Sequence, residues 1–125
     1  MATLDIVSYL RKTIQQRTNL RVPEIIPENL PDEFVLVSRE GGHRLDALRD
    51  RPGIRIECYA RTESKAKNIS DIVSELLCAL PRYCFKDGIA TVKEEIRYSD
   101  YDDKRLRPKW YASYTITTYK PKETG

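Results

Sequence analysis

The segment from residue 54 to residue 80 changes from one hydrophobic period to another, and this change constrains the fold more than any other feature of the sequence. Apolar positions first alternate with polar ones, at Ile54, Ile56, Cys58 and Ala60. They then recur every three or four residues, at Ile69, Ile72, Val73, Leu76, Leu77 and Leu80. A period of two predicts a half-buried strand, and a period near 3.6 predicts an amphipathic helix. We therefore expect a strand and then a helix, which Thr62 or Ser64 caps and Pro81 ends.

The length and composition of the chain favour one small cytosolic domain. The 125 residues suit a single domain, residues 1–125, with one modest core. The net charge of +3 is small for a dedicated nucleic-acid-binding protein. No apolar run approaches the roughly 18 residues of a membrane span, and we see no signal-peptide pattern. The three cysteines, Cys58, Cys78 and Cys84, have no metal-like spacing, so we expect reduced thiols.

The N-terminal part of the chain predicts a helix and a short, irregular strand. Residues 3–17 predict the helix, with Thr3 as its N-cap. The apolar stripe of this helix is Leu4, Val7, Leu10 and Ile14. Residues 20–26 predict a strand at the edge of a sheet, because Pro23 and Pro27 interrupt the apolar positions.

Two neighbouring segments then differ sharply in polarity. The apolar run Phe34–Ser38 has the length and the β-branched residues of a strand, and we expect a central strand that is covered on both faces. Residues 39–53 are too polar for a core and long for a hairpin loop. We expect this segment to be either a mobile tip or a segment that a partner orders.

The last third of the chain predicts a long β-hairpin. The first strand places Ala90, Val92, Ile96 and Tyr98 on one face, and the second places Trp110, Ala112, Tyr114 and Ile116 on one face. A polar tip, residues 99–109, joins them, and we expect a disordered tail from about residue 121. The whole pattern predicts an α+β fold. This fold has a mostly antiparallel four- to five-stranded sheet, two helices packed on one face and a long C-terminal β-hairpin.

The glycine-rich segment does not resemble a catalytic or cofactor site. His43 is the only histidine, and no further residues lie at metal-ligand spacing from it. Gly41 and Gly42 lack the longer glycine pattern, the Lys-Ser/Thr pair and the helix of a phosphate-binding loop. We therefore interpret these glycines as part of a flexible tip.

The clustered carboxylates do not indicate chemistry either. Asp100, Asp102 and Asp103 lack the glycine and glutamate that complete a calcium loop, and Asp102 and Asp103 are typical turn residues. Glu94 and Glu95 are adjacent on a strand, so they point to opposite faces and cannot act as an acid–base pair. We expect no enzyme activity, no cofactor and no metal site.

The charged residues of the two polar tips are the best candidates for binding a partner. The basic ones are Arg44, Arg49, Arg51, Lys104, Arg105, Arg107 and Lys109. The acidic ones among them are Asp46, Asp50, Asp100, Asp102 and Asp103. This mixture suits protein–protein salt bridges better than a phosphate backbone, which favours one sign of charge. Tyr111, Tyr119 and the polar helix face around Cys78 are further candidates for an interface.

The chain resembles the tail terminator (tail completion, minor tail) proteins of long-tailed bacteriophages. The stretch that carries the resemblance is RPGIRIECYARTESKAKNISDIVSELLCAL, a Pro-led alternating strand followed by an amphipathic helix rich in Ala and Leu. An N-terminal helix, LDIVSYLRKTI, and a final hairpin, IATVKEEIRYSDYDDKRLRPKWYASYTITTYK, extend it over nearly the whole chain. Pro23 and Pro27, in the first strand, are departures from the pattern.

The resemblance implies a structural virion protein that is made in the host cytoplasm and is not an enzyme. Such proteins form a ring, here a homo-hexamer, that caps the tail tube, ends tail polymerisation and joins the tail to the head. The implied partners are further copies of the chain, the tail tube protein and a head-completion or connector protein. No membrane is involved, and DNA can pass through the ring without specific binding. As a hypothesis, the contacts come from Arg44, Arg49, Arg51, Lys104, Arg105, Arg107, Tyr111 and Tyr119.

Three alternatives stay open at this point. The chain could form another ring of the phage neck, such as a head-completion or connector protein. It could be a small basic nucleic-acid-binding module, which predicts a steep salt dependence of binding. It could also be an enzyme subunit whose site is shared between chains, which requires converging titratable groups.

Overall fold

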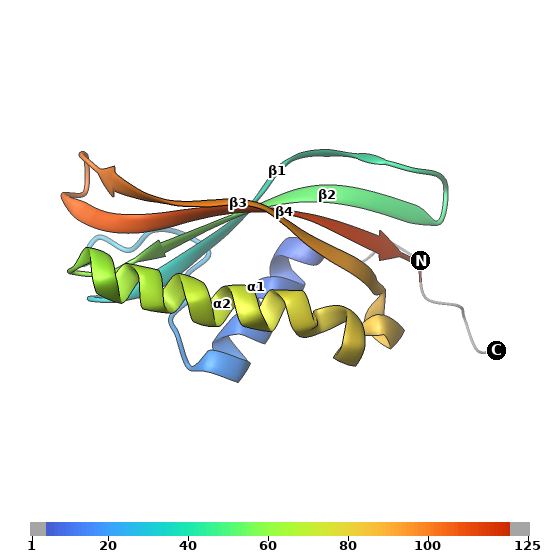
Figure 1. The fold of residues 1–125 in the computed structure, drawn as a ribbon, viewed down its shortest axis with the longest axis horizontal. Coiled ribbons are helices and arrows are strands. Elements are labelled where there is room, and N and C mark those ends of the chain that lie inside the picture. Colours follow the sequence, from blue (N-terminus) through green and yellow to red (C-terminus); the bar gives the residue numbers. More distant parts are fainter. Residues whose placement is uncertain (1–4, 121–125) are drawn as a thin grey trace.

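The computed structural model describes residues 5–120, which form a four-stranded antiparallel sheet with two α-helices on one face (Figure 1). The elements are α1 (Ile6–Thr18), β1 (Phe34–Arg44), β2 (Arg49–Tyr59), α2 (Glu63–Tyr83), the short 3-10 helix η1 (Phe85–Asp87), β3 (Ile89–Asp102) and β4 (Arg107–Tyr119). The strand order is β1-β2-β4-β3, and every neighbouring pair is antiparallel. The predicted α+β class and the long C-terminal hairpin, β3–β4, are confirmed.

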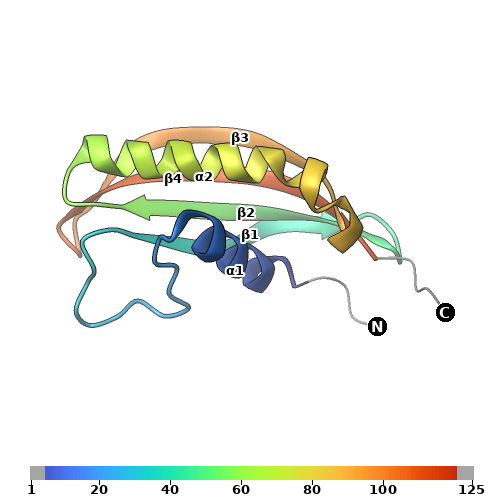
Figure 2. The same cartoon turned by 90° about the horizontal axis from the view of Figure 1, so that it is seen from below.

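Both helices cover the same face of the sheet, and one core lies between them and the strands (Figure 2). α1 packs against β1, whereas α2 packs against β2, β3 and β4. Both α-helices and all four strands contribute buried apolar residues, among them Ile6, Leu10, Ile14, Val35, Val37, Ile54, Ile56, Cys58, Val73, Leu77, Ile89, Ala112, Tyr114 and Ile116. Neither helix covers the opposite face of the sheet, which we call the open face.

The predicted strand–helix unit is present as β2 and α2. Thr62 is the N-cap of α2, and its side chain accepts a hydrogen bond from the backbone N–H of Lys65 (3.3 Å). The buried face of the helix includes Ile69, Val73, Leu77 and Leu80. The change of period in the sequence therefore marks the true boundary between the two elements.

Two details of α2 differ from the prediction. Ile72 is 49% exposed, because it lies on a flank of the helix and not over the sheet. The helix also continues through Pro81 to Tyr83. A proline removes one helical hydrogen bond, but buried Leu80 anchors the last turn, and its carbonyl accepts a hydrogen bond from the Cys84 N–H (2.6 Å).

The first helix begins at Ile6, the second described residue. Asp5 is the N-cap of α1, and its carboxylate accepts a hydrogen bond from the backbone N–H of Ser8 (3.2 Å). The predicted cap, Thr3, and the first residue of the predicted stripe, Leu4, lie outside the described residues, as does the predicted tail from residue 121. The buried positions of α1 are Ile6, Leu10 and Ile14, while Val7 is half-buried.

The prediction of an edge strand at residues 20–26 was wrong. Residues 19–33, which we call the proline loop, form no strand, because Pro23 and Pro27 cannot donate to a ladder. One sheet-like contact remains, since the Arg21 carbonyl accepts a hydrogen bond from the N–H of Val35 (2.9 Å). Buried Val22 ties the same segment to the core.

The prediction of a central strand at residues 34–38 was also wrong, because β1 is the terminal strand of the sheet. Phe34, on the open face, is nevertheless fully buried, since its ring stacks on that of Tyr59 at 4.5 Å between centroids. The continuous apolar run is therefore explained by this local cover on the open face and not by a central position.

Residues 39–53 form a β-hairpin and not the expected long loop. β1 extends to Arg44 and β2 begins at Arg49. The extra chain length is taken up by a shift in strand register between Arg39 and Gly42. Gly42 has a φ of +88°, and a Cβ atom there would lie 2.4 Å from the carbonyl oxygen of Arg51. Gly42 therefore allows the two strands to approach closely, and the prediction that it belongs to a flexible tip was wrong.

A second bulge reverses the predicted faces of β3. The register shifts between Glu94 and Ile96, so the side chains that follow exchange faces. Tyr98 then pairs with Tyr111 on the open face, and Arg97 faces α2. Ile96 and Tyr98, predicted to share the apolar face of Val92, are consequently 51% and 42% exposed.

The two glycines of the first bulge offer a matched test of this architecture. We expect Gly41→Ala to lower the free energy of unfolding by about 1 kcal/mol, since φ is +71° but the Cβ position is open. Gly42→Ala adds a backbone clash to a similar φ, so we expect a loss of about 2 kcal/mol or more. Urea denaturation of both variants measures the difference, and equal losses would contradict the close approach of the strands at Gly42.

Candidate partner-binding surfaces

The two polar tips lie at opposite ends of the sheet (Figure 1). We call residues 44–51 the β1–β2 tip and residues 102–107 the β3–β4 tip. In the ladder, Asp50 of the first tip pairs with Thr118 near the end of β4, whereas Arg107 of the second tip begins β4. Because β4 contains 13 residues, roughly 40 Å of strand separates the tips. The predicted basic residues therefore form two separate surfaces.

Asp46 organises the β1–β2 tip. Its carboxylate accepts hydrogen bonds from the backbone N–H groups of Leu48 (2.9 Å) and Arg49 (2.8 Å) and from the side chain of Arg49 (2.8 Å). The Arg49 side chain, followed by the Leu48 N–H, lowers the pKa of Asp46. Within residues 5–120, exposed Arg44 and Arg51 form no ion pair, so their charges are available to a partner.

Apolar side chains lie beside this tip. Leu48 is 61% exposed and Phe85 is 55% exposed. The ring of Phe85 contacts that of Tyr119 at 5.0 Å between centroids, and the Leu48 carbonyl accepts a hydrogen bond from the N–H of Lys120 (2.7 Å). The β1–β2 tip, η1 and the end of β4 thus form one continuous surface. Tyr119, predicted as an interface residue, is half-buried within it.

Asp102 organises the β3–β4 tip from a buried position. Its carboxylate accepts hydrogen bonds from the N–H groups of Lys104 (3.1 Å) and Arg105 (3.0 Å), from the Arg105 side chain (2.6 Å) and from the Tyr59 hydroxyl (2.8 Å). Burial raises the pKa of Asp102, but hydrogen bonds from Arg105 and Tyr59 outweigh burial and lower it to about 2. The Arg105 side chain therefore stabilises its own tip and is not available to a partner.

The other predicted residues of this tip differ in their availability. The Arg107 guanidinium donates hydrogen bonds to the carbonyls of Pro31 (2.8 Å) and Asp32 (3.2 Å), which fixes the tip to the proline loop. Lys104 is exposed and forms no ion pair within the described chain. Lys104 is thus the predicted cation of this tip that remains available to a partner.

Leu106 is the most unusual residue of the β3–β4 tip. Its side chain is 72% exposed and its φ is +54°. A left-handed conformation costs an L-residue about 1 kcal/mol, and glycine would avoid this cost. Its exposure and its strained backbone make Leu106 a candidate for contact with a partner.

The open face carries a third candidate surface around Tyr111. The Tyr111 hydroxyl donates a hydrogen bond to Glu40 (2.6 Å), and its ring contacts that of Tyr98 at 5.0 Å between centroids. The Arg55 guanidinium lies 5.5 Å from the ring centroid. Burial, followed by the bond to Glu40, raises the pKa of Tyr111. Tyr111 is half-buried, so exposed Tyr98 and Ile96 supply most of the apolar surface here.

The helix face around Cys78 already has partners within the subunit. Asp71 forms an ion pair with Arg97 of β3, and Ser74 forms a hydrogen bond with Glu94. Cys78 itself is exposed, as predicted, and all three cysteines are unpaired. A neighbouring subunit is therefore not needed to explain the polar residues of this face.

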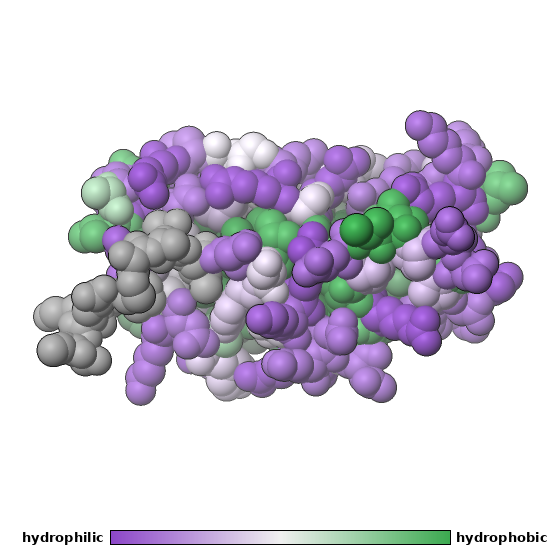
Figure 3. Space-filling model, turned by 180° about the vertical axis from the view of Figure 1, so that it is seen from behind, coloured by the Kyte–Doolittle hydropathy of each residue, from purple (hydrophilic) through white to green (hydrophobic). Residues whose placement is uncertain are grey.

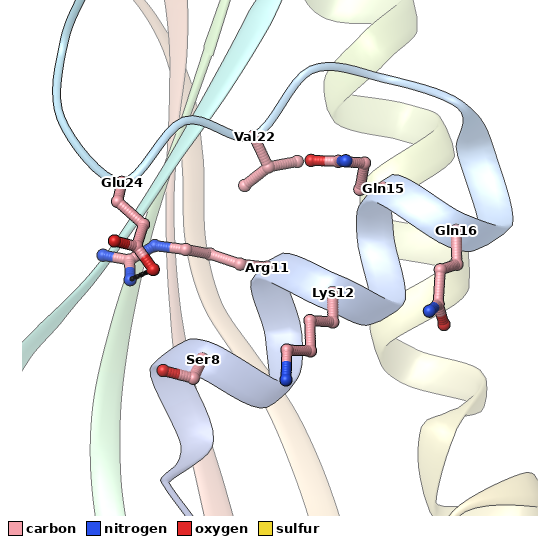
Figure 4. Close-up of a pocket in the computed structure, with 7 residues that line it drawn as sticks. All are labelled: Ser8, Arg11, Lys12, Gln15, Gln16, Val22 and Glu24. Carbon is pink, nitrogen blue, oxygen red and sulfur yellow. Dashed lines mark ion pairs between the residues drawn. The ribbon is translucent and has the colours of Figure 1, made fainter.

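The described chain has hollows that polar and charged side chains line. A hollow of about 380 Å³ lies between α1 and the proline loop, where Arg11 extends toward Glu24 at 4.0 Å (Figure 4). Ser8 also lines it, and its hydroxyl donates a hydrogen bond to the carboxylate of Asp5 (3.0 Å), the N-cap of α1. His43 is exposed on β1.

Residues 5–120 contain no group of three or more His, Cys, Asp or Glu side chains that could hold a metal ion. Neither helix is long and apolar enough to span a membrane.

Sequence reasoning missed the exposed apolar residues at the two ends of the sheet. Leu48, Leu106 and Ile25, which is 83% exposed, each stand next to charged or proline residues. Seen from behind, the surface is mostly hydrophilic, with small separate apolar areas (Figure 3). The signal in the sequence that could have indicated these exposed residues is a large apolar residue inside an otherwise polar turn.

No family model and no curated protein matches the sequence.

Asp102 gives the β3–β4 tip a testable pH dependence. Its folded-state pKa of about 2 lies below the ordinary value of 3.8. A lowered pKa stabilises the fold above the ordinary value, and this contribution disappears as the pH falls through the folded-state value. We expect Asp102→Asn to cost about 2 kcal/mol at neutral pH and to differ little from wild type below about pH 2.

Urea denaturation of wild type and Asp102→Asn between pH 7 and acid measures this difference. Asp103→Asn is the matched control, because exposed Asp103 accepts no hydrogen bond from the tip. A pH-independent difference between wild type and Asp102→Asn would contradict the role given to the buried carboxylate.

Proposed function

We propose that the chain is a subunit of a structural ring in a phage virion, at the junction of head and tail. In this role a homo-hexamer caps the tail tube, ends its polymerisation and offers the surface that joins the head. The resemblance to tail terminator proteins in the order of elements supports the proposal, and the α+β fold is compatible with it.

The observation that carries the proposal is the pair of unlike tips at opposite ends of one sheet. One end has an exposed turn held locally by Asp46, with Leu48 and Phe85 exposed. The other end is held by buried Asp102 and presents Leu106 with one cation that has no partner within residues 5–120, Lys104. Copies that join through two different surfaces form heterologous contacts, which close into a ring when the rotation between copies allows it. A subunit with unlike ends suits this kind of assembly.

The position of the tips also favours a structural role over nucleic-acid binding. A nucleic-acid-binding module benefits from cations gathered on one face. Here roughly 40 Å of strand separates the two groups, and Arg49 and Arg105 are paired with Asp46 and Asp102. The cations left over suit local contacts with acidic protein surfaces.

Solution mass measured by light scattering over a range of concentrations tests the proposal, with the same sample imaged on grids. A hexameric ring, or an equilibrium between monomer and hexamer, supports it. A two-fold dimer at every concentration contradicts it, because an isologous pair does not build a six-fold ring. If the chain is monomeric, mixing it with assembled tail tubes decides whether the ring forms only on its tube.

Leu106 allows assembly to be separated from stability. We expect Leu106→Gly to keep or raise the free energy of unfolding by up to about 1 kcal/mol, because glycine relieves the positive φ. We also expect the variant to lose ring formation, on its own or on tubes, because it lacks the exposed side chain. Asp103→Gly is the control, since it changes the same turn without removing apolar surface. Normal rings from Leu106→Gly would show that Leu106 makes no subunit contact.

A further inference from the structure

We infer that the basic end of one copy binds the proline loop of a second copy. The basic end consists of the β1–β2 tip, η1 and Lys120; the proline loop is residues 19–33. This contact rests on the proposed ring and specifies which surfaces join neighbouring subunits. The argument uses the charge, the exposed apolar residues and the positions of the two surfaces.

The proline loop is acidic and presents an apolar residue. Its charged residues are Arg21, Glu24, Glu28, Asp32 and Glu33. Ile25 is 83% exposed, and the neighbouring Glu24 side chain is 79% exposed. Within the described chain, exposed Glu28 and Glu33 form no ion pair. The loop therefore offers two carboxylates that are unpaired within the described residues, Glu28 and Glu33, and one exposed aliphatic side chain, Ile25.

The basic end has the opposite charge and a similar apolar centre. Its cations are Arg44, Arg49, Arg51, Lys86 and Lys120, and its carboxylates are Asp46, Asp50 and Asp87. Asp46 is paired with Arg49, and Asp50 is paired with Arg39. Exposed Leu48 and Phe85 lie among these charges. An acidic surface with an aliphatic centre is the partner that this end fits.

Both surfaces are held in shape before they meet. Pro23, Pro27 and Pro31 restrict the backbone of the loop. The carboxylate of Asp46 holds the turn of the β1–β2 tip through the N–H groups of Leu48 and Arg49. Ordering costs little on binding when the contact segments are already rigid.

The two surfaces cannot meet within one copy. The proline loop leads into the start of β1, and the β1–β2 tip follows its end (Figure 2). β1 contains 11 residues, so roughly 35 Å separates the surfaces. Each copy then has one basic end and one acidic loop, so the contact is heterologous and can continue around a ring.

Pairing between the free sheet edges of two copies is a less favourable alternative to this contact. β1 has a register shift between Arg39 and Gly42, and β3 has two, next to Ile89 and next to Glu94. Bulges and charged side chains on edge strands oppose pairing with another strand. Continuous pairing of β3 with the β1 of a neighbour is therefore disfavoured.

Two charge-reversed variants test the contact by complementation. The first, Arg44→Glu with Arg51→Glu, reverses the tip, and the second, Glu28→Lys with Glu33→Lys, reverses the loop. In each variant alone, the tip and the loop that should bind each other carry charge of the same sign. We therefore expect its self-association to weaken by about tenfold or more. In an equimolar mixture both contacts are again complementary, so we expect alternating rings of the wild-type mass.

Light scattering and sedimentation of wild type, each variant and the mixture supply the readout. The control, Lys67→Glu with Lys93→Glu, changes the net charge as the tip variant does but on exposed residues of α2 and β3 outside both surfaces, and we expect it to assemble normally. Wild-type association by each variant alone, or no recovery in the mixture, overturns the inference. So does a wild-type chain without self-association at any soluble concentration.

The outcomes also separate this inference from the proposed function. Six-fold rings from wild type and from both variants alone would leave the ring proposal standing and remove this contact. A two-fold dimer of wild type would remove both.

Discussion

Tyr59 connects all four strands at one end of the open face. Its ring stacks on Phe34 of β1 at 4.5 Å between centroids, its hydroxyl donates to Asp102 at the end of β3 (2.8 Å), and Lys109 of β4 lies 5.8 Å from its ring centroid. Tyr59 is only 1% exposed although no helix covers it. Because Asp102 in turn holds the β3–β4 tip, the shape of that tip depends on a side chain at the end of the inner strand β2.

The opposite end of the sheet is built from weaker and more local contacts. The β1–β2 tip depends on Asp46, whose partners Leu48 and Arg49 are two and three residues away. Its carboxylate is 43% exposed, so the ion pair with Arg49 contributes little stability. The two ends therefore differ. The β3–β4 tip is fixed by hydrogen bonds to buried Asp102, whereas the β1–β2 tip is held by exposed, local contacts and carries arginines that are unpaired within the described residues. This difference is what a heterologous assembly requires of its subunit.

The sequence predicted those elements whose hydrophobic period is uninterrupted. β2, α2 and β4 follow their patterns, and even the cap Thr62 is in place. Two of the failures share one cause, since a bulge adds a residue that no period reveals. The bulge between Glu94 and Ile96 moved Tyr98 to the open face, and the one near Gly42 turned an expected loop into strand. The candidate site failed for a different reason. Arg105 and Arg107 were predicted from charge alone, but hydrogen bonds within the subunit already engage them.

The bulges, which the sequence patterns did not predict, also oppose pairing of the sheet edges between copies. A sheet with two free edges is liable to pair with other copies without limit, which suits a fibre and not a ring of fixed size. Both edge strands, β1 and β3, carry bulges, and β3 adds Lys93, Glu94 and Glu95 close to one of them. In the proposed ring, contact between copies is therefore made by the tips and loops. There the geometry of charged and apolar side chains sets the angle between copies, and that angle determines whether a chain of subunits closes.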